Sequence, residues 1–89
     1  MMSPRDLLAW NVKKQRGLKG LSQERLSFES GLERVAISQI ERKRINPGID
    51  SVGRIAQALG VPIAELFKEP AEGEARPANL RPGRRAVKD

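Results

Sequence analysis

Apolar residues recur at helical spacing through the first two-thirds of the chain and become sparse after Lys68. A repeat of about three to four residues indicates amphipathic helices rather than strands. The pattern predicts five short helices, at residues 4–16, 23–30, 34–42, 51–59 and 62–67. Because the connections between them are short, we expect an all-α fold in which five helices form one compact domain over residues 1–68.

Local signals at the helix ends support these boundaries. Serine and aspartate favour the position just before a helix, and glycine favours the left-handed position just after one. The expected caps are Ser3, Ser22 and Asp50 at the starts, with Gly31 and Gly60 at the ends of the second and fourth helices. Segment 17–20 is expected to break the first helix because it begins and ends with glycine. Pro62 is expected to begin the fifth helix.

Nine apolar side chains fall on the inward faces of these helices and form the expected core. They are Leu8, Val12, Leu26, Leu32, Ile37, Ile40, Ile55, Leu59 and Leu66. This is enough apolar surface for a small helical core but not for an enzyme-sized cleft. The single tryptophan, Trp10, fits either the core or an interface, and the sequence does not choose between them.

The C-terminal segment, residues 69–89, is rich in proline, glycine and alanine and has almost no large apolar residue. Such a segment buries too little surface to offset its ordering entropy, so we expect a disordered or loosely attached tail. Its charges are segregated, with Glu69, Glu72 and Glu74 followed by Arg76, Arg81, Arg84, Arg85 and Lys88. Two interpretations stay open: a merely solvated tail, or a basic arm that adds contacts to phosphates.

The charge balance points to a polyanionic partner. Seventeen basic residues against eleven acidic ones give the 89-residue chain a net charge of +6. Nucleic acid is the first candidate and an anionic membrane surface the second. No apolar run approaches the about 18 residues that a membrane span needs. The first six residues also lack the features of a signal peptide, so we expect a cytoplasmic protein outside the membrane.

Two residue types that carry much of enzyme chemistry are absent from the sequence. The chain has no cysteine and no histidine. Their absence excludes disulfides and thiolate nucleophiles, and it removes the usual general base at neutral pH and the commonest metal ligand. We therefore expect no enzyme activity, no metal and no cofactor.

Residues 21–41 contain a helix, a tight glycine turn and a second helix. Apolar residues in both helices are spaced to lock them at a wide angle, and Gly31 permits positive φ in the turn. On the third expected helix, the face opposite Ile37 and Ile40 offers Arg34, Val35, Ser38 and Gln39. Arginine suits guanine, glutamine suits adenine and valine suits the thymine methyl group, so this face suits base edges in the major groove.

Four blocks of sequence in this order and spacing resemble one family. They are Gly20-Leu21-Ser22-Gln23-Glu24-x-Leu26, Ser38-x-Ile40-Glu41-Arg42, Asn46-Pro47, and Ile55-Ala56-x-Ala58-Leu59-Gly60-Val61. Residues 8–67 resemble the Cro/phage-repressor class of helix-turn-helix proteins, the XRE family, with particular similarity to restriction–modification controller proteins. The resemblance implies a lambda-repressor-like, five-helix DNA-binding domain.

The resemblance also implies roles for individual residues. The family's base readers match Arg34, Val35, Ser38 and Gln39, and its phosphate contacts match Ser22, Gln23, Arg42, Lys43, Arg44 and Asn46. A structural ion pair in the family matches Arg16 and Glu41. The sequence departs from the family at Lys43, where glycine is usual. If that position is left-handed, lysine costs about 1 kcal/mol there.

The last expected helix raises the question of dimerisation, because it is unusually apolar for its length. Val61, Ile63, Leu66 and Phe67 either fold back on the core or form a self-complementary patch. In the family this helix commonly forms a two-fold interface. A dimer would hold two recognition helices about 34 Å apart, which predicts a palindromic operator.

These observations favour a homodimeric, sequence-specific transcription regulator whose partner is double-stranded DNA. RNA polymerase is a further candidate partner if the protein activates transcription. The alternative is an antitoxin-like or adaptor module that uses the same scaffold to bind a protein. In 89 residues we expect no separate ligand-sensing domain, and so control by concentration and dimerisation.

Overall fold

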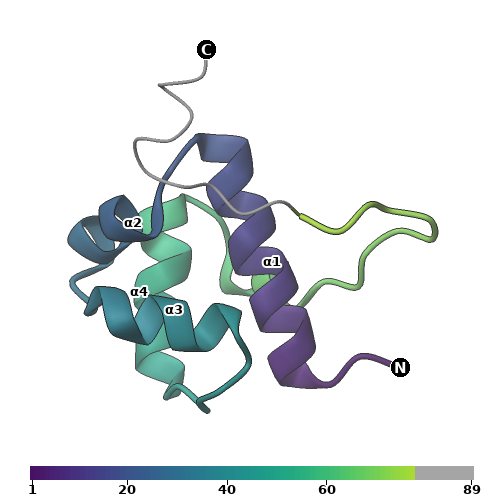
Figure 1. Cartoon of the computed structure of the whole chain (residues 1–89), viewed down its shortest axis with the longest axis horizontal. Coiled ribbons are helices and arrows are strands. Elements are labelled where there is room, and N and C mark those ends of the chain that lie inside the picture. The colour runs from purple at the N-terminus through teal and green to yellow at the C-terminus, as the bar shows by residue number, and fades with distance from the viewer. Residues whose placement is uncertain (78–89) are drawn as a thin grey trace.

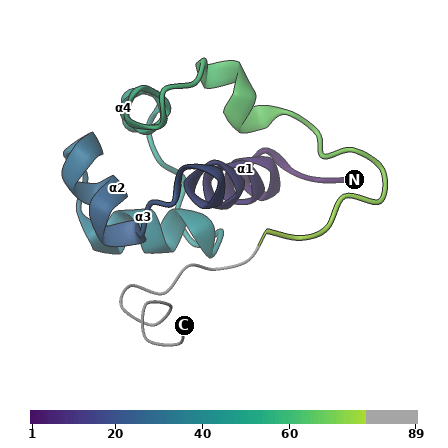
Figure 2. The ribbon, with the colours of Figure 1, turned by 90° about the horizontal axis from the view of Figure 1, so that it is seen from above.

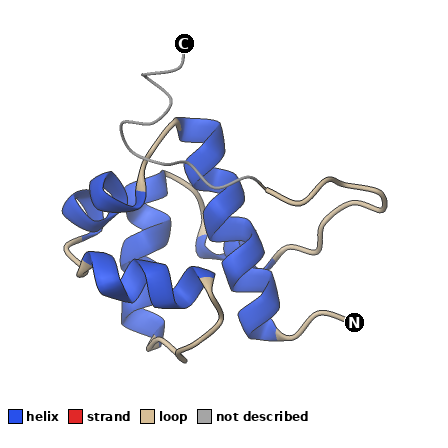
Figure 3. Cartoon of the chain, in the orientation of Figure 1, coloured by secondary structure: helices blue, strands red, loops and turns tan. Residues whose placement is uncertain are grey.

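A computed structural model describes residues 1–77 of the chain. Within these residues it contains four α-helices, one 3-10 helix and no strand (Figure 3). The helices are α1 (Pro4–Lys19), α2 (Gln23–Ser30), α3 (Arg34–Glu41), α4 (Ile49–Leu59) and the 3-10 helix η1 (Ile63–Phe67). The all-α prediction is confirmed. The number of α-helices is four and not five.

The fifth predicted helix is a single short 3-10 element. Pro62 lies outside it in extended backbone, with φ −65° and ψ 148°, and Lys68 beyond its end is extended as well. The hydrogen bond from the Glu65 amide to the Pro62 carbonyl, at 2.9 Å, spans three residues and is of the 3-10 kind. A segment this short gains too few bonds to propagate an α-helix.

The first helix is longer than predicted. It continues through Gly17 to Lys19 and ends at Gly20, which adopts the left-handed conformation at φ 68°. A glycine inside a helix costs about 1 kcal/mol relative to alanine but does not end it, whereas a left-handed glycine does. At the other end, the Ser3 hydroxyl accepts from the Asp6 amide at 3.1 Å and Asp6 accepts from the Ser3 amide at 2.9 Å. This capping box fixes the start that the sequence predicted.

The fourth helix begins two residues before the predicted start. Gly48 occupies the N-cap position without any side-chain cap, and Asp50 lies within the first turn. The prediction that Asp50 caps this helix is therefore wrong. Its carboxylate is still favourably placed, because negative charge in the first turn complements the helix dipole. Gly60 ends the helix at φ 72°, as predicted.

In space, α1 runs through the middle of the molecule. Helices α2 and α3 lie on one side of it, and α4 and η1 on another (Figures 1 and 2). The core between them contains eight of the nine predicted residues as fully buried side chains: Leu8, Val12, Leu26, Ile37, Ile40, Ile55, Leu59 and Leu66. Leu32, the ninth, packs half-buried against the same core. This core fixes α3 by its inner face and leaves the outer face free.

Residues 69–77, which we name the strap, loop outward after η1 and return to α1 (Figure 1). The carboxylate of Glu74 in the strap forms an ion pair with Lys14 of α1 at 2.8 Å. This part of the predicted tail therefore has defined contacts. The remainder of that prediction, residues 78–89 with Arg81, Arg84, Arg85 and Lys88, lies outside the described residues.

Candidate nucleic-acid interface

The turn between α2 and α3 is held by local hydrogen bonds. Ser22 caps α2, its hydroxyl accepting from the Arg25 amide at 3.0 Å. Gly31 takes φ 79° and its amide donates to the Ser27 carbonyl at 2.9 Å. The Ser27 hydroxyl donates to the Leu32 carbonyl across the turn. These bonds stabilise the turn, while Leu26 of α2 and Ile37 of α3 pack in the shared core.

The outer face of α3 carries the four predicted base readers. Arg34 and Val35 are exposed, the latter to 61%, and Ser38 and Gln39 are half-buried. Ile37, on the opposite face, is fully buried. An α-helix with its side chains is about 10–12 Å across, which is close to the width of the major groove. The helix is therefore fixed by its apolar face and offers its polar face to a groove of that size.

Gln39 has an unusual environment for a surface amide. Its Oε1 atom is buried and has no hydrogen-bond partner among the described residues. A buried acceptor without a partner is costly, and such groups are rare in folded proteins. The side chain would gain a partner by turning outward to a donor on a ligand.

Behind this face lies the predicted pair of Arg16 and Glu41, which is present as a bidentate ion pair. Arg16 Nε lies 2.7 Å from Glu41 Oε2, and Nη2 lies 2.8 Å from Oε1. Arg16 also donates to the Leu21 carbonyl at 2.8 Å. Gln23 donates to Glu41 Oε1 at 3.0 Å. The pair thus joins α1, the start of α2 and the end of α3. Gln23, predicted as a phosphate contact, has its side chain in this network.

The segment after α3 is exposed and basic. Arg42, Lys43, Arg44 and Asn46 are all exposed. Lys43 has φ 62°, the one positive φ at a non-glycine position among residues 1–77. The Arg44 amide donates to the Gln39 carbonyl at 2.9 Å, closing the helix over this left-handed residue. Lys43 therefore has the left-handed backbone that is strained for lysine at a glycine position. Its side-chain Nζ lies 3.5 Å from Asp6 Oδ1.

The predicted dimer residues lie in different environments. Leu66 is fully buried in the core of one copy, so its side chain is not available to a second copy. Its assignment to an interface is corrected by this burial. Val61 and Phe67 are half-buried against the core, and Ile63 is 39% exposed. The surface available to a second copy is therefore centred on Ile63.

Two residues with distinctive environments were absent from the sequence prediction. Asn11 is 4% exposed on α1, and its amide donates to the carbonyls of Leu66 and Lys68 at 3.2 and 2.9 Å. Its position between Leu8 and Val12, on the inward face, is the signal that could have identified it. Phe28 is 76% exposed on α2, with the Arg25 guanidinium 5.3 Å from its ring centre.

None of the helices among residues 1–77 is both long and apolar enough to cross a bilayer.

Comparison with known proteins assigns the fold. The helix-turn-helix family HTH_3 matches residues 12–66. A hypothetical transcription factor of Neisseria meningitidis is 41% identical over 68 residues, which are 76% of this chain and 64% of the relative. The control protein C.SmaI of Serratia marcescens is 37% identical over 66 residues, 74% of this chain and 79% of that protein.

Solved structures agree with this assignment. The transcription factor NHTF from Neisseria superposes with a TM-score of 0.75 at 40% identity, covering 79% of this chain and 80% of that one. The restriction-modification controller protein C.AhdI from Aeromonas hydrophila gives 0.67 at 36% identity, covering 68% and 92%. Transcription regulators recur among these relatives, and no catalytic family does. The chain belongs to the HTH_3 (XRE-type) family of helix-turn-helix DNA-binding transcription regulators.

Proposed function

We propose that this protein is a homodimer that binds a palindromic operator with α3 in the major groove. The observation that carries the proposal is the division of α3 into two faces. Its inner face is fixed by buried isoleucines and by the Arg16–Glu41 pair, while Arg34 and Val35 stand free on the outer face. A rigid helix with a free polar face meets the geometric need of base reading.

Each outer side chain has a chemically suitable target. Arg34 donates to O6 and N7 of guanine, Gln39 bonds N6 and N7 of adenine, and Val35 contacts a thymine methyl group. Ser38 bonds either kind of base edge. The partnerless Oε1 of Gln39 supports this role, because an adenine N6 donor would satisfy it.

Phosphate contacts come from both ends of the motif. The N-terminus of α2, at Ser22 and Gln23, offers backbone amides and a positive dipole to one phosphate. The exposed segment after α3 supplies further contacts on the other side, from Arg42, Lys43, Arg44 and Asn46. Two of the relatives are named as control or controller proteins, and we propose a regulatory role for this protein as well.

A second copy associates through the surface around Ile63, with the exposed edges of Val61 and Phe67. Two-fold symmetry then repeats α3 about one helical turn away, at about 34 Å. Such a regulator acts where the chromosome lies, in the cytoplasm, and RNA polymerase is its further partner if it activates transcription.

The test uses an operator selected from random duplex DNA and the double variant Arg34→Ala/Gln39→Ala. The variant keeps the wild-type fold, because both side chains lie on the outer face, and it loses discrimination between operator and scrambled DNA. Each lost base contact is worth about 1–3 kcal/mol. Unchanged discrimination would refute α3 as the reading helix. Retained binding to a protein partner, with no operator preference in the wild type, would favour an antitoxin-like or adaptor module.

A further inference from the structure

Two contacts with α1 hold the strap, one just before its first residue and one within it. Before its start, the buried Asn11 amide donates to the Lys68 carbonyl at 2.9 Å. Farther along, Glu74 accepts from Lys14 at 2.8 Å and from the Ala71 amide at 2.8 Å. Between these two contacts the strap loops outward and then returns to α1 (Figure 1).

The single tryptophan lines one cavity together with Arg76 and Pro77 of the strap. Trp10 is half-buried, and its indole N–H is buried without a hydrogen-bond partner among residues 1–77. The pKa of the Glu74 carboxyl is lowered chiefly by the hydrogen bond from Lys14 and then by that from the Ala71 amide. Glu74 is therefore held ionised in the strap, and Trp10, which lies beside the strap, reports on its position.

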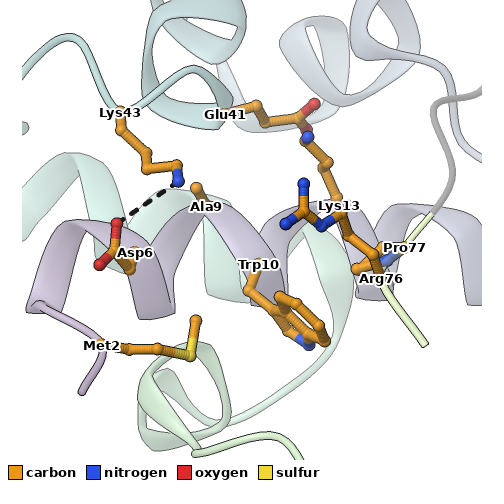
Figure 4. A pocket seen from close by; sticks show the side chains of 9 residues that line it. All are labelled: Met2, Asp6, Ala9, Trp10, Lys13, Glu41, Lys43, Arg76 and Pro77. Atoms are coloured by element: carbon orange, nitrogen blue, oxygen red, sulfur yellow. Dashed lines mark ion pairs between the residues drawn. The ribbon is translucent and has the colours of Figure 1, made fainter. Parts of the chain in front are cut away.

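The last described residues of the strap meet the end of α3 at a cavity of about 340 Å³ (Figure 4). Three cationic residues line this cavity, and each comes from a different segment: Lys13 from α1, Lys43 from the segment after α3, and Arg76 from the strap. Figure 2 shows the strap passing to the same side of α1 as α3, away from α4. The cavity therefore adjoins the basic segment that follows the reading helix.

The charges around this cavity are unbalanced. Of its two carboxylates, Asp6 lies 3.5 Å from Lys43, and Glu41 is neutralised by the buried Arg16. Lys13 and Arg76 have no acidic partner within 4 Å among residues 1–77. Cations gathered without counter-charges repel each other, and binding a polyanion relieves that repulsion.

We propose that Lys13 and Arg76, beside Lys43, form a second DNA-backbone site that binds phosphates flanking the operator. This site rests on the proposed function and extends its footprint beyond the helix-turn-helix. The sequence after Pro77 continues with four basic residues and one acidic residue, so the chain stays basic beyond Arg76.

The experiment measures operator affinity against salt concentration for the full chain, on duplexes with and without about one helical turn of flanking DNA. Lys13→Gln and Arg76→Gln each weaken binding several-fold on the flanked duplex and reduce the slope of log affinity on log salt by about 0.9. Base preference stays unchanged. Arg54→Gln, the matched control, removes an exposed charge from α4 and leaves the slope at the wild-type value.

A second pair of variants tests the strap itself. Glu74→Gln and Glu72→Gln make the same charge change in the same segment, but only Glu74 holds Lys14. Glu74→Gln weakens binding to the flanked duplex and shifts Trp10 emission, while Glu72→Gln does neither. If both variants strengthen binding equally, the strap positions nothing and only net charge matters.

Three outcomes overturn the proposal separately from the proposed function. Wild-type salt slopes in Lys13→Gln and Arg76→Gln, with operator binding intact, would remove the second site alone. Tighter binding by these variants would make the strap an obstacle to DNA. Saturable quenching of Trp10 by inorganic phosphate, with no effect of either variant on DNA, would assign the cavity to a small anion. A wild-type protein without operator preference would instead refute the function on which the site depends.

Discussion

Arg16 and Glu41 meet through two hydrogen bonds of 2.7 and 2.8 Å, with side-chain exposures of only 1% and 2%. The free-energy cost of desolvating both charges offsets much of their Coulombic attraction, so the pair adds little net stability. Its geometry is specific, however, because a bidentate pair accepts one relative orientation of α1 and α3. The pair therefore sets the position of α3 against α1.

Breaking this pair from one side is predicted to be severe. Arg16→Met leaves Glu41 buried without its counter-charge and lowers the free energy of unfolding by about 3–5 kcal/mol. The double variant Arg16→Met/Glu41→Leu recovers most of that loss, because no unpaired charge remains. Urea unfolding of the three proteins at one pH checks both statements. A single variant as stable as the wild type would contradict the account of the pair.

Lys43 is predicted to lower the stability of the fold while its charge strengthens DNA binding. Lys43→Gly relieves the left-handed backbone at φ 62° and raises the free energy of unfolding by about 1 kcal/mol, while it weakens DNA binding. Lys43→Gln separates the two effects: it weakens binding to the same degree and gains no stability. Thermal unfolding and operator affinity are measured on both variants. A stabilised Lys43→Gln variant would show that charge, not backbone strain, limits stability here.

Substitutions at Ile63 and Leu66 are predicted to have different effects, although both residues lie in the same 3-10 helix. Ile63→Glu places charge on the exposed surface and converts dimer to monomer with the fold intact. Leu66→Ala opens a hole in the core and lowers the free energy of unfolding by about 2–5 kcal/mol. Sedimentation equilibrium and urea unfolding distinguish the two. A dimeric Ile63→Glu variant would show that the interface between copies does not include Ile63.

The strap is predicted to loosen in acid. The pKa of Glu74 is lowered by Lys14, so the ion pair is fully formed above the ordinary glutamate pKa and is lost as pH falls through the lowered value. Trp10 emission follows this transition in the wild type and is flat with pH in Glu74→Gln. Asp6 also has a lowered pKa, chiefly through the Ser3 amide, so a transition that persists in Glu74→Gln would assign it to that end of α1.

Features governed by local signals could be predicted from the sequence. Ser3, Ser22, Gly31 and Gly60 act on their own helix ends, and the period of apolar residues identifies the core because each helix has one inward face. The outer face of α3 follows from the same period. These signals need only neighbours within about one turn.

Features that depend on distant partners could not be predicted in this way. The burial of Leu66 depends on how η1 docks, and a short apolar segment gives no signal for which side faces inward. The strap depends on Asn11 and Lys14 meeting atoms more than fifty residues away. Gln23 has the residue type of a phosphate contact, and only the fold brings it to Glu41.

The most direct test of the central claim is selection of DNA from a random duplex pool by the purified full chain, with competitor DNA and at two salt concentrations. We predict a palindromic consensus whose half-sites lie about one helical turn apart, bound by two copies, with affinity that falls steeply as salt rises. Enrichment of no sequence, with binding that depends only on salt, would contradict it and reduce the basic surface to a general attraction for polyanions.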